Sequence, residues 1–518
     1  MAIKPFKNEP LTDFSKPANR KLMEKALAKV KAMLGREYPL VIGGEEIHTA
    51  DKLKSINPSR PMEIVGSFSK ADPELAKKAI ETAASKFEEW QWVAPKKRAD
   101  YLFKAAKLMR KRKHEFSAVM IYEVGKTWPE ADADTAEAID FLEFYAREIL
   151  RYSAKQPITK YPGEKNELLY IPIGVGVVVP PWNFALAILT GMTSAAVVTG
   201  NTVVLKPSSD SPLTGWMFFN LMREVGLPPG VINFVAGSGA SVGDVLVAHP
   251  KTRFVSFTGS KEVGIHVNEI AAKVQPGQKW LKRVVAEMGG KDSIIIDDQT
   301  DIDAAAQATL VSAFGFQGQK CSAASRAIVV EKVYDKFLDI LKSKVDKLKT
   351  GDGENPANYM GPVVNKSSEE KILAYIQKGI AEGGRLVSGG KKADGEGYFI
   401  QPTVIADVDP KATIAQEEIF GPVLAVIKVK DFDEALEVAN NTEFGLTGGI
   451  WTNNRKKIEK AKKIFHVGNF YVNRKITGAL VGVHPFGGFN MSGTDSKAGG
   501  RDYLLLFLQA KALSEKVK

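Results

Sequence analysis

The sequence predicts an α/β protein that consists of two consecutive α/β domains. Its 518 residues are too many for one small hydrophobic core. Between Ile171 and Leu205 no residue is charged, and short apolar segments there alternate with a stretch of helical character. Near-continuous apolar strands between helices are typical of a parallel sheet covered on both faces. A second series of the same kind follows Glu287, so we expect two such sheets.

The overall composition is that of an ordinary globular protein, with 44% hydrophobic and 25% charged residues. The formal net charge is +11, which would be compatible with a nucleic-acid partner. Residues 1–36, however, hold nine basic and three acidic residues and so account for six of these charges. Elsewhere basic and acidic residues are interspersed, and no Lys/Arg stripe interleaved with aromatic residues is present. We therefore expect no nucleic-acid binding.

Two features bear on the compartment and on membrane association. Residues 1–10 lack an apolar core followed by a small-residue cleavage site, so we expect no secretory signal. Together with the single cysteine this favours the reducing cytoplasm. The uncharged run 171–205 is long enough to span a membrane, but Pro172, Pro180 and Pro181 break any such helix. We expect no membrane segment.

The first third of the chain is predicted to be mainly helical. Apolar residues at the spacing of one helix face predict a docking helix over 20–34: Met23, Leu27, Val30 and Leu34. Short turn-rich pieces follow it. Two or three long amphipathic helices are then expected over 73–151, one including 102–112 and another 131–150.

The two α/β series follow. In the first, strands are expected at 176–179, 202–205, 231–235 and 253–257, and helices at 187–198, 212–226, 240–248 and 261–273. In the second, strands at 293–296 and 326–330 alternate with helices at 302–313 and 333–348. Further strands and helices continue to about residue 471. The single cysteine thus lies near the start of the second domain.

Cys321 has neighbours that favour a nucleophile. One cysteine can form neither an intramolecular disulfide nor a multi-thiolate zinc site, which leaves an inert, a redox or a nucleophilic thiol. Inert cysteines usually lie among large aliphatic residues, whereas Cys321 lies in Gly-Gln-Lys-Cys-Ser-Ala-Ala. These small neighbours let a substrate approach the sulfur. The Lys320 ammonium would favour the thiolate if it lay close.

Two further residues have chemistry that suits attack on a carbonyl. Asn183 follows Pro-Pro-Trp directly after a predicted strand, and its amide could stabilise an oxyanion, although Asn is often only a turn residue. Glu287 lies between apolar and glycine positions, where burial would raise its pKa toward that of a general base; a structural or exposed Glu is the alternative. The six histidines are scattered, without metal-ligand spacing: His48, His114, His249, His266, His466 and His484. We expect no metal.

Two segments after predicted parallel strands could bind a nucleotide. Lys206 begins the sequence Lys-Pro-Ser-Ser at the carboxyl end of a strand, where α/β sheets bind ligands, although a solvated lysine is the alternative. Gly259, Ser260 and Gly264 follow the strand at 253–257 and open a helix. Backbone N–H groups at that helix start could receive a pyrophosphate.

The order of seven motifs along the chain resembles the aldehyde dehydrogenase superfamily: PWNF, KPS, FTGS, EMGGK, GQKCS, EEIFGP and PFGG. The resemblance covers essentially the whole chain. It implies a Rossmann-type NAD domain, an α/β catalytic domain and a small oligomerisation arm. On this sequence the cofactor domain would comprise 1–151 and 171–286, and the catalytic domain 287–475. Residues 476–498 would form an anchor loop and return, and 152–170 with 499–518 the arm, whose C-terminal strand would lie around Tyr503 to Phe507.

The same resemblance implies roles for individual residues. Cys321 would be the nucleophile, Asn183 would form the oxyanion hole with the Cys321 backbone N–H, and Glu287 would activate water to hydrolyse a thioester. The implied cofactor is NAD, held by Lys206, Ser208, Ser209, Gly259, Ser260, Gly264, Glu418 and Phe420. The implied partners are a small aldehyde substrate and further copies of the chain, in a dimer or a larger homo-oligomer.

Within the superfamily, the Phe314–Arg326 segment, the loop Ile-Thr-Gly-Ala-Leu at 476–480 and the N-terminal helix resemble the branch that oxidises L-glutamate γ-semialdehyde in proline degradation. An amino-acid end needs anion-binding N–H groups at a fixed distance from the sulfur. The substrate-binding residues implied are Phe184, Lys320, Ser322, Gly478, Ala479 and Phe486.

Several alternatives remain open. Many NAD-preferring members carry Glu three residues after the lysine of the KPS motif, but Ser209 stands there, so NADP could also be accepted. Another branch, for example one acting on succinate semialdehyde, is the second candidate function. A catalytically silent member of the fold and a cofactor-free cysteine hydrolase are less consistent with the retained motifs and the dinucleotide-type domain.

Overall fold

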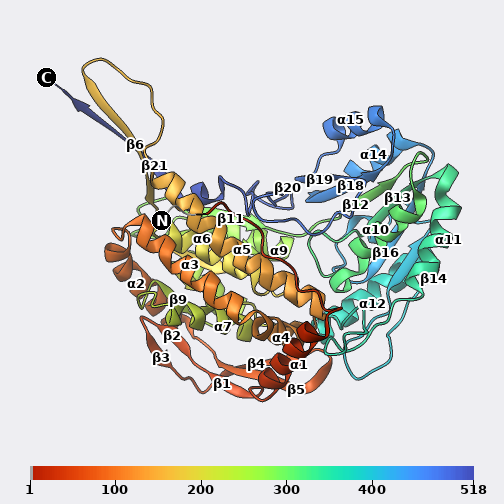
Figure 1. Cartoon of the computed structure of the whole chain (residues 1–518), viewed down its shortest axis with the longest axis horizontal. Coiled ribbons are helices and arrows are strands. Elements are labelled where there is room, and N and C mark those ends of the chain that lie inside the picture. The colour runs from red at the N-terminus through yellow and green to blue at the C-terminus, as the bar shows by residue number, and fades with distance from the viewer. Residues whose placement is uncertain (1–3, 518) are drawn as a thin grey trace.

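The computed structural model describes residues 4–517. It has two α/β bodies, each built on a seven-stranded sheet, and Figure 1 shows them side by side with a two-stranded ribbon projecting from the first. The strands of the first sheet lie within residues 40–287 and those of the second within residues 293–472. The two predicted sheets are confirmed.

The first sheet has the strand order β11-β10-β7-β8-β9-β2-β3. Its strands are β2 (Leu40–Ile42), β3 (Glu45–Ile47), β7 (Val175–Val179), β8 (Thr202–Leu205), β9 (Ile232–Phe234), β10 (Thr252–Thr258) and β11 (Arg283–Glu287). The five strands from β7 to β11 run parallel to one another, whereas β2 pairs antiparallel with both β9 and β3 at one edge. Ligands of parallel sheets bind beyond the carboxyl ends of the strands, which here include Glu287.

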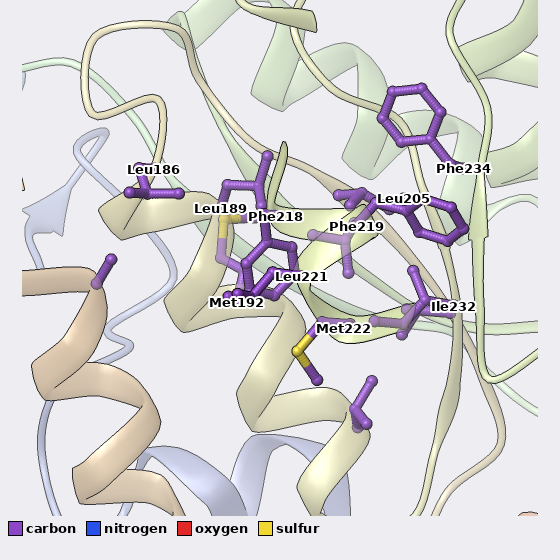
Figure 2. Packing of buried hydrophobic residues seen from close by; sticks show 14 of the residues in the cluster. Leu186, Leu189, Met192, Leu205, Phe218, Phe219, Leu221, Met222, Ile232 and Phe234 are labelled. Carbon is purple, nitrogen blue, oxygen red and sulfur yellow. The ribbon is translucent and has the colours of Figure 1, made fainter. Parts of the chain in front are cut away.

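Helices surround this sheet and bury its apolar residues. They are α2 (Pro73–Trp90), α3 (Pro95–Lys111), α4 (Lys113–Val124), α5 (Trp128–Ser153), α6 (Ala187–Val198), α7 (Pro212–Glu224), α8 (Asp244–Ala248) and α9 (Lys261–Ala272). Figure 2 shows part of this core, where Leu189 and Met192 of α6 lie near Phe218 of α7. The segment Gly239–Gly243 before α8 is a π-helical turn, η1.

The second sheet has the order β14-β15-β16-β13-β12-β18-β19. Its strands are β12 (Ser293–Ile296), β13 (Arg326–Val330), β14 (Arg385–Ser388), β15 (Thr403–Ala406), β16 (Val423–Val429), β18 (Thr447–Trp451) and β19 (Asn469–Val472). Only β14 is antiparallel to its neighbour. The helical segments of this body are α10 (Ile302–Phe314), η2 (Gly315–Gly318), η3 (Glu331–Val333), α11 (Tyr334–Val345), α12 (Lys366–Ala381), α13 (Thr413–Gln416), α14 (Phe432–Asn440) and α15 (Arg455–Ile464).

Smaller elements complete the fold. A three-stranded sheet consists of β1 (Arg36–Tyr38), β4 (Lys52–Asn57) and β5 (Arg60–Ser69), and a two-stranded one of β17 (Phe444–Gly445) and β20 (Phe489–Asn490). The projecting ribbon in Figure 1 pairs β6 (Glu164–Pro172) antiparallel with β21 (Leu508–Lys516).

The prediction of a strand around Tyr503 to Phe507 was wrong. This segment is the 3₁₀-helix η4, whose Tyr503, Leu504 and Phe507 are buried, and the strand begins only at Leu508. Aromatic and aliphatic side chains here serve the core of the first body, because Tyr503 stacks on Tyr145 of α5. The packing of residues within 152–170 against a C-terminal strand is nevertheless present as the β6–β21 pair.

Two predictions in the helical region also needed correction. The first helix is α1 (Pro17–Lys31), so Leu34 lies beyond its end, while Met23, Leu27 and Val30 are buried as expected. Residues 73–151 contain four helices rather than two or three. The unforeseen one, α4, is buried on nearly all sides, so its sequence lacks the alternation of apolar and polar residues that reveals a surface helix.

Among residues 4–517, no helix is long and apolar enough to cross a membrane. The uncharged run from Ile171 to Leu205 instead contains β7, α6 and β8, as the proline and glycine residues predicted. The domain boundaries given above remain a prediction.

Candidate active site

Cys321 lies just after η2, in a loop with an unusual backbone. Phe316, Gln317 and Gly318 have positive φ angles of 50°, 54° and 65°. For residues other than glycine, this conformation costs energy and persists only when the surroundings enforce it. The loop is held from outside, because the Gln319 side-chain Oε1 accepts a hydrogen bond of 3.0 Å from the backbone N–H of Val364.

The backbone packing at Gly318 leaves no room for a side chain. A Cβ at this position would lie 2.2 Å from the carbonyl oxygen of Gly421, which belongs to the backbone and cannot easily move. We expect Gly318→Ala to lower the free energy of unfolding by roughly 2–4 kcal/mol. Denaturant titration would measure this effect. Gly239→Ala is the control, because a Cβ there meets no atom within 4 Å; equal stability of the two variants would contradict the prediction.

Asn183 lies beside this loop. It follows β7, is only 4% exposed, and its Nδ2 donates a 3.0 Å hydrogen bond to the carbonyl oxygen of Gln319. Asn183 and Cys321 line the same cavity. The amide has a second N–H, so the structure brings a polar donor to the neighbourhood of the thiol.

Glu287 is the last residue of β11 and lines a second cavity that also contains Cys321. Its Oε2 accepts a 3.3 Å hydrogen bond from the N–H of Gly488, and its Oε1 accepts one from the Ser496 hydroxyl. Burial nevertheless raises the pKa of the carboxyl group to about 8. Glu287 is half-buried, and its carboxyl group has the upward pKa shift that burial was expected to cause.

The electrostatic role predicted for Lys320 was wrong. Burial raises the pKa of the Cys321 thiol well above its usual value, and the nearby carboxylates of Asp292, Glu287 and Glu418 raise it further. The Lys320 side chain lines a separate cavity, where the charges of Glu130 and Glu137 act on it. The turn at Cys321 directs these two adjacent side chains into different cavities, and sequence proximity therefore did not place this ammonium at the sulfur.

The predicted cofactor residues mostly meet in one cavity. Besides Asn183 and Cys321, it is lined by Lys206, Ser208, Ser209, Gly259, Ser260, Glu418 and Phe420. Gly264 does not line it. A Cβ at Gly264 would lie 2.4 Å from the sulfur of Met288, so this glycine permits close packing of α9.

A buried lysine and a half-buried glutamate face this cavity. Lys206 is 5% exposed, and burial lowers the pKa of its ammonium to about 8. Glu418 accepts a 3.0 Å hydrogen bond from the N–H of Gly290, and burial raises the pKa of its carboxyl group. Gly289 leaves room for that carboxyl, since a Cβ there would lie 2.1 Å from it. Sequence reasoning missed several other lining residues, among them Trp182, Met288, Lys371 and Ile419.

Most of the predicted substrate residues meet on the other side of Cys321. The cavity shared with Glu287 is also lined by Phe184, Ser322, Gly478, Ala479 and Phe486. Lys320 is absent from this lining and belongs to the adjoining cavity, which shares Phe184, Gly478 and Ala479 with it. Cys321 thus lies where the cofactor-type and substrate-type cavities meet.

Sequence reasoning missed one wall of this cavity. It consists of residues from α5, α6 and η4: Glu137, Phe141, Tyr145, Ile188, Met192 and Tyr503. Glu137 is the only acid among them, and burial raises the pKa of its carboxyl group to about 8. Glu137 is one of seven acidic residues in α5, so its place in the sequence did not distinguish it.

Lys126 was also missed, although it contacts α5, the loop after β7 and the loop before Cys321. Its Nζ forms a buried 2.5 Å ion pair with Asp134 and lies 4.8 Å and 4.6 Å from the ring centres of Phe184 and Phe316. The other oxygen of Asp134 accepts a 2.6 Å hydrogen bond from the N–H of Ala187. A cation between two aromatic faces is favourable when it is shielded from water.

Comparison with known proteins agrees with this arrangement. Residues 46–513 match the model of the aldehyde dehydrogenase family. The 1-pyrroline-5-carboxylate dehydrogenase of Geobacillus sp. (strain WCH70) is 58% identical over 513 residues, covering 99% of each chain. The 1-pyrroline-5-carboxylate dehydrogenase 2 of Bacillus subtilis (strain 168) is 58% identical over 511 residues, again covering 99% of each.

Solved structures show the same fold over nearly the whole chain. The 1-pyrroline-5-carboxylate dehydrogenase from Thermus with bound NAD has a TM-score of 0.98 and 52% identity, with full coverage of both chains. Betaine aldehyde dehydrogenase from Staphylococcus aureus in complex with NAD⁺ has a TM-score of 0.89 and 30% identity, covering 96% of this chain and 98% of that one. The chain described here belongs to the aldehyde dehydrogenase family.

Proposed function

We propose that this protein oxidises L-glutamate γ-semialdehyde, formed from 1-pyrroline-5-carboxylate, to L-glutamate with NAD, as a step of proline degradation. One observation carries the proposal: the only thiol of the chain opens on one side to a nucleotide-type cavity and on the other to a cavity with two backbone-rich anchor residues, Gly478 and Ala479. Full-length relatives at 58% identity, named 1-pyrroline-5-carboxylate dehydrogenases, support the same substrate.

The residues around the cofactor cavity fit NAD. Lys206 is buried there without a carboxylate partner among its hydrogen bonds, so its ammonium is free to bind a ribose hydroxyl or phosphate oxygen. Glu418 offers a carboxylate acceptor for ribose hydroxyls, and the backbone at Gly259 and Ser260 begins α9, where N–H groups suit a pyrophosphate. Bound NAD would supply the acceptor for the hydride released from the substrate.

Cys321 would attack the aldehyde carbon through its sulfur, forming a tetrahedral adduct. The Asn183 amide and the Cys321 backbone N–H would donate hydrogen bonds to the oxyanion of this adduct. Loss of the hydride converts the adduct to a thioester on Cys321. Glu287 would then take a proton from water, whose oxygen attacks the thioester carbon, releasing L-glutamate and the thiol.

The substrate cavity suits an amino-acid aldehyde. The backbone N–H groups at Gly478 and Ala479, with the Ser322 hydroxyl, would receive the α-carboxylate, while Phe184 and Phe486 would flank the methylene groups. Glu137, on the α5 wall of this cavity, provides a carboxyl group that can accept a hydrogen bond from the α-ammonium. Lys320 lies in the adjoining cavity, where its charge would attract the substrate carboxylate on the way in.

Initial rates of NADH formation would test the proposed substrate. We expect the rate with 1-pyrroline-5-carboxylate to be far higher than with succinate semialdehyde, which has no α-ammonium group. Equal or better turnover of succinate semialdehyde would overturn the proposed substrate. NAD and NADP are compared in parallel, because Ser209 places no carboxylate against a 2′-phosphate and its hydroxyl would tolerate one.

The pH dependence of thioester hydrolysis should follow Glu287. Only the deprotonated carboxylate can accept a proton from water, and its pKa is raised to about 8. We therefore expect the hydrolysis rate to rise with pH through about 8, where half of the carboxyl groups are deprotonated, and to level off roughly one pH unit higher. Stopped-flow measurement of single turnovers from about pH 6 to about pH 10 checks this. A flat profile would contradict the assignment of the base.

We further propose that the β6–β21 ribbon is an oligomerisation arm. The ribbon projects from the body (Figure 1) and exposes large apolar side chains at Leu169 and Leu513, as does the preceding segment at Ile158 and Tyr161. Exposed apolar groups on a projecting ribbon favour burial against another copy. Sedimentation should therefore give more than one chain per particle. A nucleophilic single thiol also supports a cytoplasmic, reducing location.

A further inference from the structure

Residues 4–15 precede α1 and contain neither helix nor strand; we call this segment the N-terminal strap. Figure 1 shows this red segment running along α5 before α1 begins. Aspartates of α5 hold it at two points. Asp140 accepts hydrogen bonds from the Asn8 side chain (2.8 Å) and the Glu9 N–H (2.6 Å), and Asp132 accepts two from Thr12 (2.7 and 2.6 Å).

Further contacts fix the strap in place along its length. The Lys113 ammonium donates a 3.0 Å hydrogen bond to the carbonyl oxygen of Pro10, and Arg110 forms a 2.8 Å ion pair with Glu9. Arg147 donates a 3.0 Å hydrogen bond to the carbonyl oxygen of Lys4. A segment with this many side-chain partners is an ordered part of the fold rather than a loose end.

Asn8 connects the strap to the anchor loop. Its single Nδ2 donates to Asp140 Oδ2 at 2.8 Å and to the carbonyl oxygen of Val481 at 3.0 Å. Asp140 lies three residues after Glu137 on α5 and therefore close to it on the same face of the helix. Val481 lies two residues after Ala479. One amide thus bridges the two walls of the substrate cavity that carry Glu137 and Ala479.

Packing at the end of the anchor loop reinforces this bridge. The ring of Phe6 lies 5.2 Å from that of Phe144 on α5, in an edge-to-face arrangement. A Cβ at Gly482 would lie 3.0 Å from Phe144 and 3.2 Å from Phe6, so the loop passes directly over both rings. Glu9 and Leu11 of the strap also line the cavity that adjoins the substrate site.

We propose that Asn8 is a positioning residue that sets the distance between the α5 wall and the anchor loop, and thereby the preference for aldehydes that carry an amino-acid end. This inference rests on the proposed function. A substrate held at both its carboxylate and its ammonium needs a fixed spacing between the two walls, because hydrogen bonds weaken steeply away from their preferred geometry. A simple aldehyde such as propanal needs only Cys321, Asn183 and Glu287, none of which contacts the strap.

The test compares two substrates with Asn8→Ala. We expect kcat/KM for 1-pyrroline-5-carboxylate to fall about 3- to 10-fold, mainly through KM, which is the size expected when one hydrogen bond to the substrate is weakened. The kcat/KM for propanal and the KM for NAD should not change. Asn8→Gln keeps the amide but moves it by one methylene. Its kcat/KM for 1-pyrroline-5-carboxylate should lie between those of the wild type and Asn8→Ala. It also provides the comparison should Asn8→Ala not fold.

Thr12→Ala is the matched control, because it removes a strap tether to Asp132 but leaves the Asn8 bridge intact. It should leave the ratio of the two kcat/KM values unchanged. The proposal is overturned if Asn8→Ala leaves that ratio unchanged, which includes the case in which it lowers both kcat/KM values equally. A wild-type protein that does not prefer 1-pyrroline-5-carboxylate over succinate semialdehyde would instead refute the proposed function, so the two failures are distinguishable.

Discussion

Replacement of Cys321 by alanine should abolish aldehyde oxidation while leaving NAD binding intact. The sulfur is the only thiol of the chain, and no other nucleophile among the residues lining the substrate cavity can form the thioester. We expect the rate of NADH formation to fall on the order of 10⁴-fold or more. Initial rates at saturating substrate measure the loss, and calorimetric titration with NAD measures binding.

This result would separate the chemical role of the Cys321 thiol from the binding of NAD in the cavity beside it. Cys321 lines both cavities, but the side chains that would hold the nucleotide, Lys206 and Glu418, come from other segments. The dissociation constant for NAD should therefore change little. A simultaneous loss of NAD binding would contradict the division of the site, and residual oxidation above a few per cent would exclude Cys321 as the nucleophile.

Replacement of Glu287 by glutamine should leave the first half of the reaction and slow the second. Glutamine has the shape of the carboxyl group and retains an oxygen for the Gly488 N–H, but it cannot take a proton from water. We expect a burst of NADH of about one equivalent, followed by turnover slowed about 10²- to 10⁴-fold. Rapid mixing with detection at the NADH absorbance band resolves the two phases.

The Ser496→Ala variant is the control for Glu287→Gln. Ser496→Ala removes the hydroxyl that donates to Glu287 but leaves the carboxyl group in place. Because that hydrogen bond lowers the Glu287 pKa, its loss should shift the pH profile of hydrolysis upward without eliminating turnover. An unchanged steady-state rate in Glu287→Gln would remove this residue from the mechanism.

Much of this architecture could be predicted from the sequence, because the signals were local. Apolar runs punctuated by proline and glycine placed β7, α6 and β8, and in the structure α6 and β8 have the predicted bounds. The small residues around Cys321 indicated an accessible thiol, and the flanks of Glu287 indicated burial. In each case the chemistry of neighbours in the sequence was enough.

Features that depend on distant segments could not be predicted in this way. Lys320 is adjacent to Cys321 in sequence but points into another cavity, whereas Glu137 comes from a helix about 180 residues earlier in the chain and still lines the cavity of the thiol. Asn8 and Val481 lie 473 positions apart, yet one hydrogen bond joins them. Helix α4 was missed because complete burial removes the periodicity that reveals a helix.

The central claim is that L-glutamate γ-semialdehyde is oxidised through a thioester on Cys321. The most direct test mixes the Glu287→Gln variant with 1-pyrroline-5-carboxylate and NAD, quenches in acid within the burst phase, and measures the mass of the intact chain and its peptides. The account predicts a mass increase of one γ-glutamyl group on the peptide that contains Cys321, and none in the Cys321→Ala variant. A chain of unchanged mass after a full burst of NADH would contradict it.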